Sequence, residues 1–187
     1  MTFLIIIIVV IVLIALGLIV TYNGLIASRN QTDEAYSDID VQLKRRYDLI
    51  PNLVESVKGY ANQEKGVLEA VTEARSNAIA AGGKGIAEQQ QAENNLTGAL
   101  RSVFAVAENY PDLKSSANFQ QLSTELTDTE NKLEAARRFY NANVRDFNTK
   151  VQVFPTSIFA RSLGFTKRDL FIVEDAATKE VPKVSFE

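Results

Sequence analysis

A single uninterrupted apolar stretch constrains this chain more than any other feature. From Phe3 to Val20 every residue is apolar or glycine, and the first charged side chain is that of Arg29. As a helix rising about 1.5 Å per residue, the stretch spans roughly 27 Å, close to a hydrocarbon thickness of about 30 Å. A cleaved signal peptide is the alternative, but such peptides have a basic region, a shorter apolar run and a small-residue cleavage site. We therefore predict a single-pass transmembrane helix, with residues 1–28 as membrane anchor.

The basic residues beside this span predict its orientation. The N-terminal flank has no Lys or Arg, whereas Arg29 follows the span closely. Lys and Arg near a membrane span concentrate on the cytoplasmic side. We therefore expect the body of the chain to lie in the cytoplasm rather than the periplasm, with the lipid bilayer as its first partner.

Two long helical patterns follow the anchor. In each, apolar residues recur every three or four positions and average 3.5, which is the seam of a left-handed helical bundle. The first pattern runs from Tyr36 to Ala78 and keeps its phase across Pro51. Proline removes a backbone donor, so Pro51 marks either a kink in one helix or the first turn of a second helix on the same axis. The second pattern runs from Phe119 to Phe147, and its helix is expected to end at about Phe154, before a proline.

Glycines and prolines place the remaining boundaries. The glycine-rich segment 81–85 predicts a turn between helices, and residues 86–110 predict a further helix. The apolar residues between Ile158 and Phe165 are expected to close one end of the bundle. Thr166 and Asp169 have the spacing of a capping box, which weakly indicates another short helix. The sequence thus predicts an all-α fold, with a long-helix antiparallel bundle over 29–165 and a short extended tail over 166–187.

The composition excludes most catalytic chemistry. The chain has no Cys, His or Trp, so it has neither a thiolate nucleophile nor the usual general base and metal ligand. Its 20 Lys and Arg are balanced by 23 Asp and Glu, a net charge of −3 that argues against nucleic-acid binding. Clusters of carboxylates on amphipathic helices are interpreted as solvated faces. We expect no enzyme activity, cofactor, metal or small-molecule substrate.

Two strings of residues go beyond periodicity. Residues 45–54 read RRYDLIPNLV and are followed by VKGY at 57–60; residues 134–141 read EAARRFYN and are followed by Val144 and Asn148. Both strings, the ending from Phe154 to Phe165 and the VPKV tail at 181–184 resemble the LemA family of bacterial membrane proteins. The resemblance covers essentially the whole chain.

The resemblance implies an N-terminal membrane segment in the bacterial inner membrane, followed by a bundle of long helices without established enzymatic activity. It also implies a link with membrane proteases and quality control. The motif residues have no assigned chemistry. Our structural interpretation is that Pro51 and Asn52 set a bend, while Arg46, Tyr140 and Asn141 form bonds across facing helices.

Three functional hypotheses follow from the sequence. The first is a non-enzymatic membrane-anchored scaffold that forms a homo-oligomer, because an anchor concentrates chains in one plane where weak contacts become effective. The second is an adaptor that presents clients to a membrane protease through its bundle or tail. In that role, the segment from Val181 to Phe186 would add to a partner's sheet edge; the alternative is a frayed end. The third is membrane remodelling by an amphipathic face.

Overall fold

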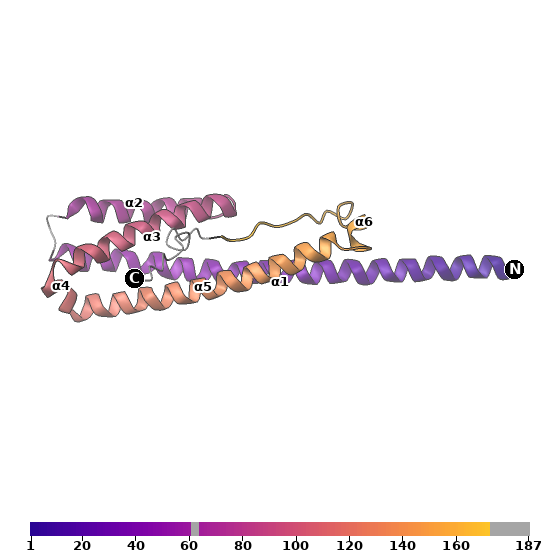
Figure 1. Cartoon of the computed structure of the whole chain (residues 1–187), viewed down its shortest axis with the longest axis horizontal. Helices are drawn as coiled ribbons and strands as arrows, with labels where there is room; N and C mark the ends of the chain where they lie inside the picture. Colours follow the sequence, from indigo (N-terminus) through magenta and orange to yellow (C-terminus); the bar gives the residue numbers. More distant parts are fainter. Residues whose placement is uncertain (61–63, 173–187) are drawn as a thin grey trace, which may run out of the picture. The chain divides into compact units, whose positions relative to one another are not determined.

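A computed structural model describes residues 1–60 and 64–172 of the chain. Helices make up most of this part, and no strand occurs within it, which confirms the predicted all-α fold. The helices are α1 (Thr2–Lys58), α2 (Lys65–Ala81), α3 (Ile86–Glu108), α4 (Pro111–Ser115), α5 (Ala117–Gln152) and α6 (Thr156–Ala160) (Figure 1). The predicted extended tail from Val181 to Phe186 lies outside the described residues.

The chain divides into two compact units. Unit 1 combines residues Met1–Leu43 with Asn131–Leu170, and unit 2 combines Lys44–Glu130 with Phe171 and Ile172 among the described residues. Residues 2–43 of α1 and residues 131–152 of α5 therefore belong to unit 1, together with α6. The remaining parts of both helices belong to unit 2, together with α2, α3 and α4.

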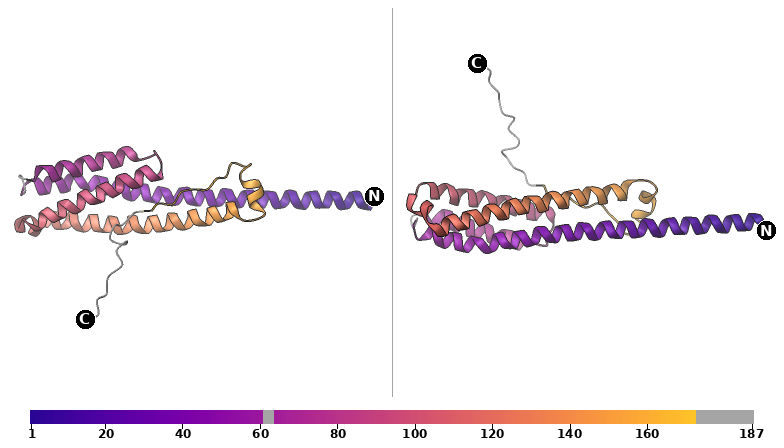
Figure 2. Two further views of the ribbon diagram at one scale, coloured as in Figure 1. Left: turned by 45° about the horizontal axis from the view of Figure 1, so that its top comes forward. Right: turned by 90° about the horizontal axis from the view of Figure 1, so that it is seen from below.

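Unit 1 contains the candidate membrane span. The apolar stretch forms the start of α1, and its side chains are exposed, with none of the most apolar window buried within the chain. Beyond it, α6 and the end of α5 lie beside α1 (Figure 2). Leu25, Phe147, Ala160 and Phe165 form the buried core between them. The exposed apolar stretch is thus followed directly by a buried helix-to-helix core.

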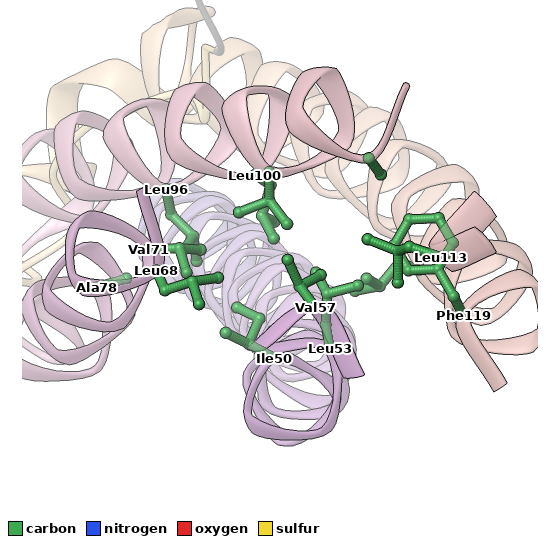
Figure 3. Close-up of a cluster of buried hydrophobic side chains, with 13 residues drawn as sticks. Ile50, Leu53, Val57, Leu68, Val71, Ala78, Leu96, Leu100, Leu113 and Phe119 are labelled. Carbon is green, nitrogen blue, oxygen red and sulfur yellow. The ribbon is translucent and has the colours of Figure 1, made fainter. Parts of the chain in front are cut away.

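Unit 2 has the larger apolar core. In it, α2 and α3 lie side by side, joined by the predicted glycine turn, in which Gly83 and Gly85 have φ angles of 79° and 125°. Side chains from α1, α2 and α3 converge with Leu113 of α4 and Phe119 of α5 (Figure 3). Phe104 and Phe119 pack edge to face, with ring centroids 6.1 Å apart. The turn and the bundle core were both predicted by the sequence.

Of the two alternatives for Pro51, the structure has one helix that runs through the proline, and the break in the first helical pattern comes later. Helix α1 continues through Pro51 and ends at Lys58, before Gly59, and α2 starts afresh at Lys65. The single pattern from Tyr36 to Ala78 therefore covers two separate helices. Asn23 and Gly24 also lie inside α1 without interrupting it. Pro51 is retained within the helix because a side chain from α2 replaces the lost hydrogen bond, as described below.

The end of the bundle also differs from the sequence prediction. Ala160 and Phe165 are buried as expected, but Ile158 and Leu163 remain 60% and 45% exposed. Residues 166–170 are extended rather than helical, so the weak capping-box prediction is wrong. Side chains of α5 hold this segment by its backbone, which overrides the local preference for a helix turn.

Candidate functional site

Unit 2 contains a buried polar cluster centred on Arg46. Its guanidinium Nη1 lies 3.2 Å from Glu93 Oε2 on α3, and Nη2 donates to Thr97 Oγ1 at 2.8 Å. The same Nη1 lies 3.3 Å from Glu130 Oε2 on α5. The hydroxyl of Tyr47 donates to the other oxygen of Glu93. We call Arg46, Tyr47, Glu93, Thr97 and Glu130 the Arg46 cluster.

The ion pair between Arg46 and Glu93 at the centre of the cluster is shielded from water. Arg46 is 3% exposed and Glu93 1%, whereas Glu130 is 44% exposed. A buried ion pair repays its desolvation only when its geometry is good and the remaining donors and acceptors are satisfied. Here Thr97 and Tyr47 add bonds to either side of the pair. The cluster therefore connects α1 with α3 and α5 at one level of unit 2.

A second polar contact joins α2 to α1 at Tyr47, the residue after Arg46. Proline at position 51 has no backbone N–H, so the carbonyl of Tyr47, four residues earlier, has no donor from the helix. The Nε of Arg75 on α2 donates to this carbonyl at 2.7 Å. Pro51 thus creates an acceptor on α1, and α2 supplies the donor.

Two open grooves lie beside this end of α1. Asn52 is exposed and lines a polar groove with Glu55 and Ser56 of α1 and with Asn118, Gln121 and Leu122 of α5. A more apolar groove of about 600 Å³ lies between α1 and α2, with Val54 and Leu68 at its walls and Lys58, Lys65, Glu69 and Glu73 also lining it.

In unit 1, Tyr140 of α5 is buried and makes two contacts. Its ring packs edge-on against Tyr36 of α1, with centroids 5.6 Å apart, and its hydroxyl donates to the Asp169 carbonyl at 3.1 Å. Burial raises the pKa of Tyr140 to about 12, and the charges of Asp169 and Asp33 contribute, while Arg168 lowers it. Burial raises the pKa of Tyr36 as well. Both phenols are therefore neutral structural groups at physiological pH.

The extended segment 166–170 is attached to α5 through its backbone. Asn148 Nδ2 donates to the Arg168 carbonyl at 2.9 Å, and the Arg168 N–H donates to Asn148 Oδ1 at 2.8 Å. This pair of bonds imitates one rung of a β-ladder. The Arg168 guanidinium also pairs with Asp33 on α1 and lies 5.9 Å from the centroid of the Phe147 ring. The segment therefore links α5 to α1.

The five motif residues singled out from the sequence fall into different units. Arg46, Pro51 and Asn52 belong to unit 2, while Tyr140 and the half-buried Asn141 belong to unit 1. Arg46 bonds across to α3 and α5. The hydroxyl of Tyr140 instead reaches the backbone of a non-helical segment. The residues therefore do not form one site but support two separate structural centres.

Sequence reasoning missed Arg75, Glu93 and the role of Asn148 in holding Arg168. One signal for Glu93 was present: it continues the spacing of Leu96, Leu100 and Val103, so a carboxylate occupies a core position of α3. A charge in such a register requires a buried partner of opposite sign. No comparable local signal identifies Arg75, because its acceptor is a backbone atom on another helix.

Comparison with known proteins agrees with this architecture. The sequence pattern of the LemA family matches residues 35–186. Protein LemA of Metamycoplasma hominis is 32% identical, over 87% of this chain and 71% of that protein. Magnetosome protein MamQ of Magnetospirillum gryphiswaldense is 23% identical and MamQ 2 of Paramagnetospirillum magneticum 22%, each over 82% of this chain but only 65% of the relative. The matched region contains both structural centres, and the chain belongs to the LemA family.

Proposed function

We propose that this protein is a membrane-anchored, non-enzymatic helical scaffold that assembles with copies of itself. One observation carries the proposal: no residue of the apolar span at the start of α1 is buried within the chain, while the helix continues into a packed body. A bilayer is the environment in which such a stretch is stable, because its backbone groups are satisfied within the helix. In this proposal the anchor lies in the bacterial inner membrane, and Arg29, which follows the span, supports a body on the cytoplasmic side.

The polar side chains of the body support a structural role. The Arg46 cluster, the Arg75 contact and the bonds of Asn148 all join helices or segments to each other. Among the described residues, no group of carboxylates has the arrangement of a metal site. The buried charges of unit 2 stiffen a framework, which suits a scaffold.

Self-assembly is favoured when the membrane anchor confines copies of a stiff protein to the plane of the bilayer. Anchored copies meet at a high effective concentration, so contacts that are weak in solution become populated. The body retains apolar side chains that its own core does not cover, for example Val41 of α1 and Phe139 of α5, which are 61% and 58% exposed. Such residues provide contact points between neighbouring copies.

Disulfide cross-linking in the membrane tests this proposal. The chain has no Cys, so single cysteines placed at successive positions from Leu13 to Ile19 report on contacts between spans without background. A specific assembly gives cross-linking that rises and falls with the helix period and survives dilution with added lipid. Uniform or dilution-sensitive cross-linking indicates random collisions and contradicts the scaffold, as does a monomeric mass in lipid nanodiscs. The cysteine-free parent chain is the control.

A further inference from the structure

A group of exposed apolar side chains surrounds α6 in unit 1. Phe154 is 80% exposed, Ile158 60%, Val153 47% and Leu163 45%. They lie within a short stretch, residues 153–164, that connects α5 to the extended segment 166–170. Large apolar side chains so close together on a surface mark a contact with something other than water. We call this stretch the α6 loop.

The α6 loop is fixed in position next to α1. Ala160 and Phe165 pack into the core formed by Leu25 and Phe147. Its last turn ends in a Schellman arrangement, in which Phe165 N–H donates to the Ala160 carbonyl at 2.9 Å. Gly164 has a φ of 80° in this turn, a conformation that glycine adopts without strain. The turn directs Phe165 inward while Leu163 remains exposed.

The contacts of Phe165 give the level of the loop along α1. Its ring packs edge-on against Tyr22, with centroids 5.9 Å apart, and the guanidinium of Arg29 lies 5.9 Å from its centroid. Tyr22 follows the last apolar residue of the span, Val20, by about 3 Å along the helix. The headgroup region on each side of the hydrocarbon is about 5–8 Å deep. Phe165 is therefore attached to α1 at the level of the lipid headgroups.

The basic side chains around the α6 loop also suit a position among the lipid headgroups. Lys150, Arg161 and Lys167 are exposed on or beside the loop, and Arg29 lies on the neighbouring helix. Apolar side chains flanked by Lys and Arg are typical of segments that lie in the membrane interface, where the cations meet anionic headgroups. The group also lies close in the chain to Phe165, which contacts Tyr22 just beyond the span. A lipid surface fits it better than a second copy of the chain.

We propose that the α6 loop is a second membrane contact, which inserts Phe154, Ile158 and Leu163 into the lipid interface beside the transmembrane helix. This inference rests on the proposed membrane anchor. The loop and the span together hold α1 and α5 to the bilayer at two points, so the body has a defined rotation about its anchor. A single helix alone leaves that rotation free.

Site-specific fluorescence in vesicles tests the proposal on the full chain. Because the chain has no Cys, Ile158→Cys, Val9→Cys and Ala142→Cys each accept one environment-sensitive label. The vesicles contain phosphatidylcholine and phosphatidylglycerol, and quenching is measured with lipid-attached nitroxide and with aqueous iodide. Val9 lies in the span, whereas Ala142 is exposed on α5 of the same unit. We expect at least two-fold stronger nitroxide quenching at Ile158 than at Ala142, and weaker iodide quenching.

The outcomes separate the loop from the anchor. If the Val9 label is in lipid and the Ile158 label behaves like that at Ala142, the loop proposal is overturned and the anchor stands. An Ile158 label shielded from both quenchers indicates a protein partner, which also overturns it. Labels at Val9 and Ile158 that are both accessible to iodide overturn the anchor and the loop together.

A second set of variants tests whether the apolar side chains cause the insertion. With the label on Ser157→Cys, an exposed position of α6, the double change Phe154→Ser and Ile158→Ser is expected to reduce nitroxide quenching to the level of Ala142. Ile79→Ser removes an exposed apolar side chain of α2 in unit 2 and is the matched control, for which no loss is expected. Equal quenching in all three backgrounds contradicts insertion by these side chains.

Discussion

Arg75 donates a 2.7 Å hydrogen bond to the backbone carbonyl of Tyr47. That carbonyl is the one that Pro51 deprives of its partner in α1. A proline inside a helix ordinarily bends or ends it, since it removes a hydrogen bond and crowds the preceding turn. Here the proline position in one helix is where a side chain of another helix binds, so Pro51 lies at the junction of α1 and α2.

Removing the Arg75 side chain is expected to destabilise unit 2 through this carbonyl. Arg75→Ala leaves the acceptor without its donor, at a cost of about 1–3 kcal/mol in the free energy of unfolding. In a Pro51→Ala background the helix supplies its own N–H, so the same substitution is expected to cost much less. Urea unfolding of the full chain in mild detergent, followed by circular dichroism, measures both. An equal loss in the two backgrounds contradicts the pairing of Arg75 with the proline defect.

The Arg46 cluster predicts strong coupling between two charges. Arg46→Met removes the cation from the buried Glu93, and breaking such a pair from one side typically costs about 3–5 kcal/mol. Combining it with Glu93→Gln removes the buried charge and keeps an acceptor for Tyr47, so the double variant is expected to be more stable than Arg46→Met. Thermal or urea unfolding measures the difference. A double variant that loses the sum of the two single effects contradicts the coupling.

Glu130→Gln is the matched control for the comparison of Arg46→Met, Glu93→Gln and the double variant. Glu130 contacts the same guanidinium but is 44% exposed, so water screens the interaction. A partly exposed ion pair contributes about 0–1 kcal/mol. The substitution is therefore expected to change the unfolding midpoint only slightly. A loss as large as that of Arg46→Met would show that the buried position of Glu93 is not what makes its pair important.

The sequence predicts the elements of this fold better than its polar centres. Apolar spacing identifies the span, the helices and the core because burial of one helix face depends on local periodicity. Arg75 and Asn148 bind backbone atoms of segments distant in the chain, and periodicity does not encode such partners. Glu93 could be predicted in part, because a carboxylate at a core position of a helix indicates a buried partner but does not identify that partner. At Pro51 the sequence leaves one helix or two helices open, because the side chain that bonds the Tyr47 carbonyl comes from another helix.

The sequence also does not show which apolar residues of the α6 loop are buried. Ile158 and Leu163 have the apolar character of core residues, so the sequence favours burying them with Phe165. The turn ending at Gly164 instead buries Phe165 and leaves the others outside. Which apolar side chains face inward depends on this turn geometry and on the neighbouring span. Composition alone does not contain that information.

Tyr140 predicts a stability change confined to alkaline pH. Its pKa is raised from 10.0 to about 12, mainly by burial, so folding favours the neutral phenol. The resulting stabilisation is complete below the unfolded value near 10 and is lost as the pH rises toward 12. An ultraviolet titration of tyrosinate is expected to show a late-ionising phenol that disappears in Tyr140→Phe. Because burial also raises the pKa of Tyr36, the titration is made in a Tyr36→Phe background. A late step that remains there after Tyr140→Phe shows that Tyr140 is not the group concerned.

Asn148 predicts local loosening of the extended segment without loss of the helices. Asn148→Ala removes both bonds to the Arg168 backbone, each worth about 1 kcal/mol, while Phe165 and the α6 turn stay in place. Asn148→Asp keeps the acceptor for the Arg168 N–H but loses the donor to its carbonyl, so its effect is expected to be intermediate. Amide hydrogen exchange of segment 166–170 measures this, with Thr149→Ala, an exposed neighbour on α5, as control. In Asn148→Ala we expect faster amide exchange only in residues 166–170, because the helices keep their own hydrogen bonds. Unchanged exchange in Asn148→Ala would show that the Arg168–Asp33 pair and the Tyr140 bond hold the segment without Asn148.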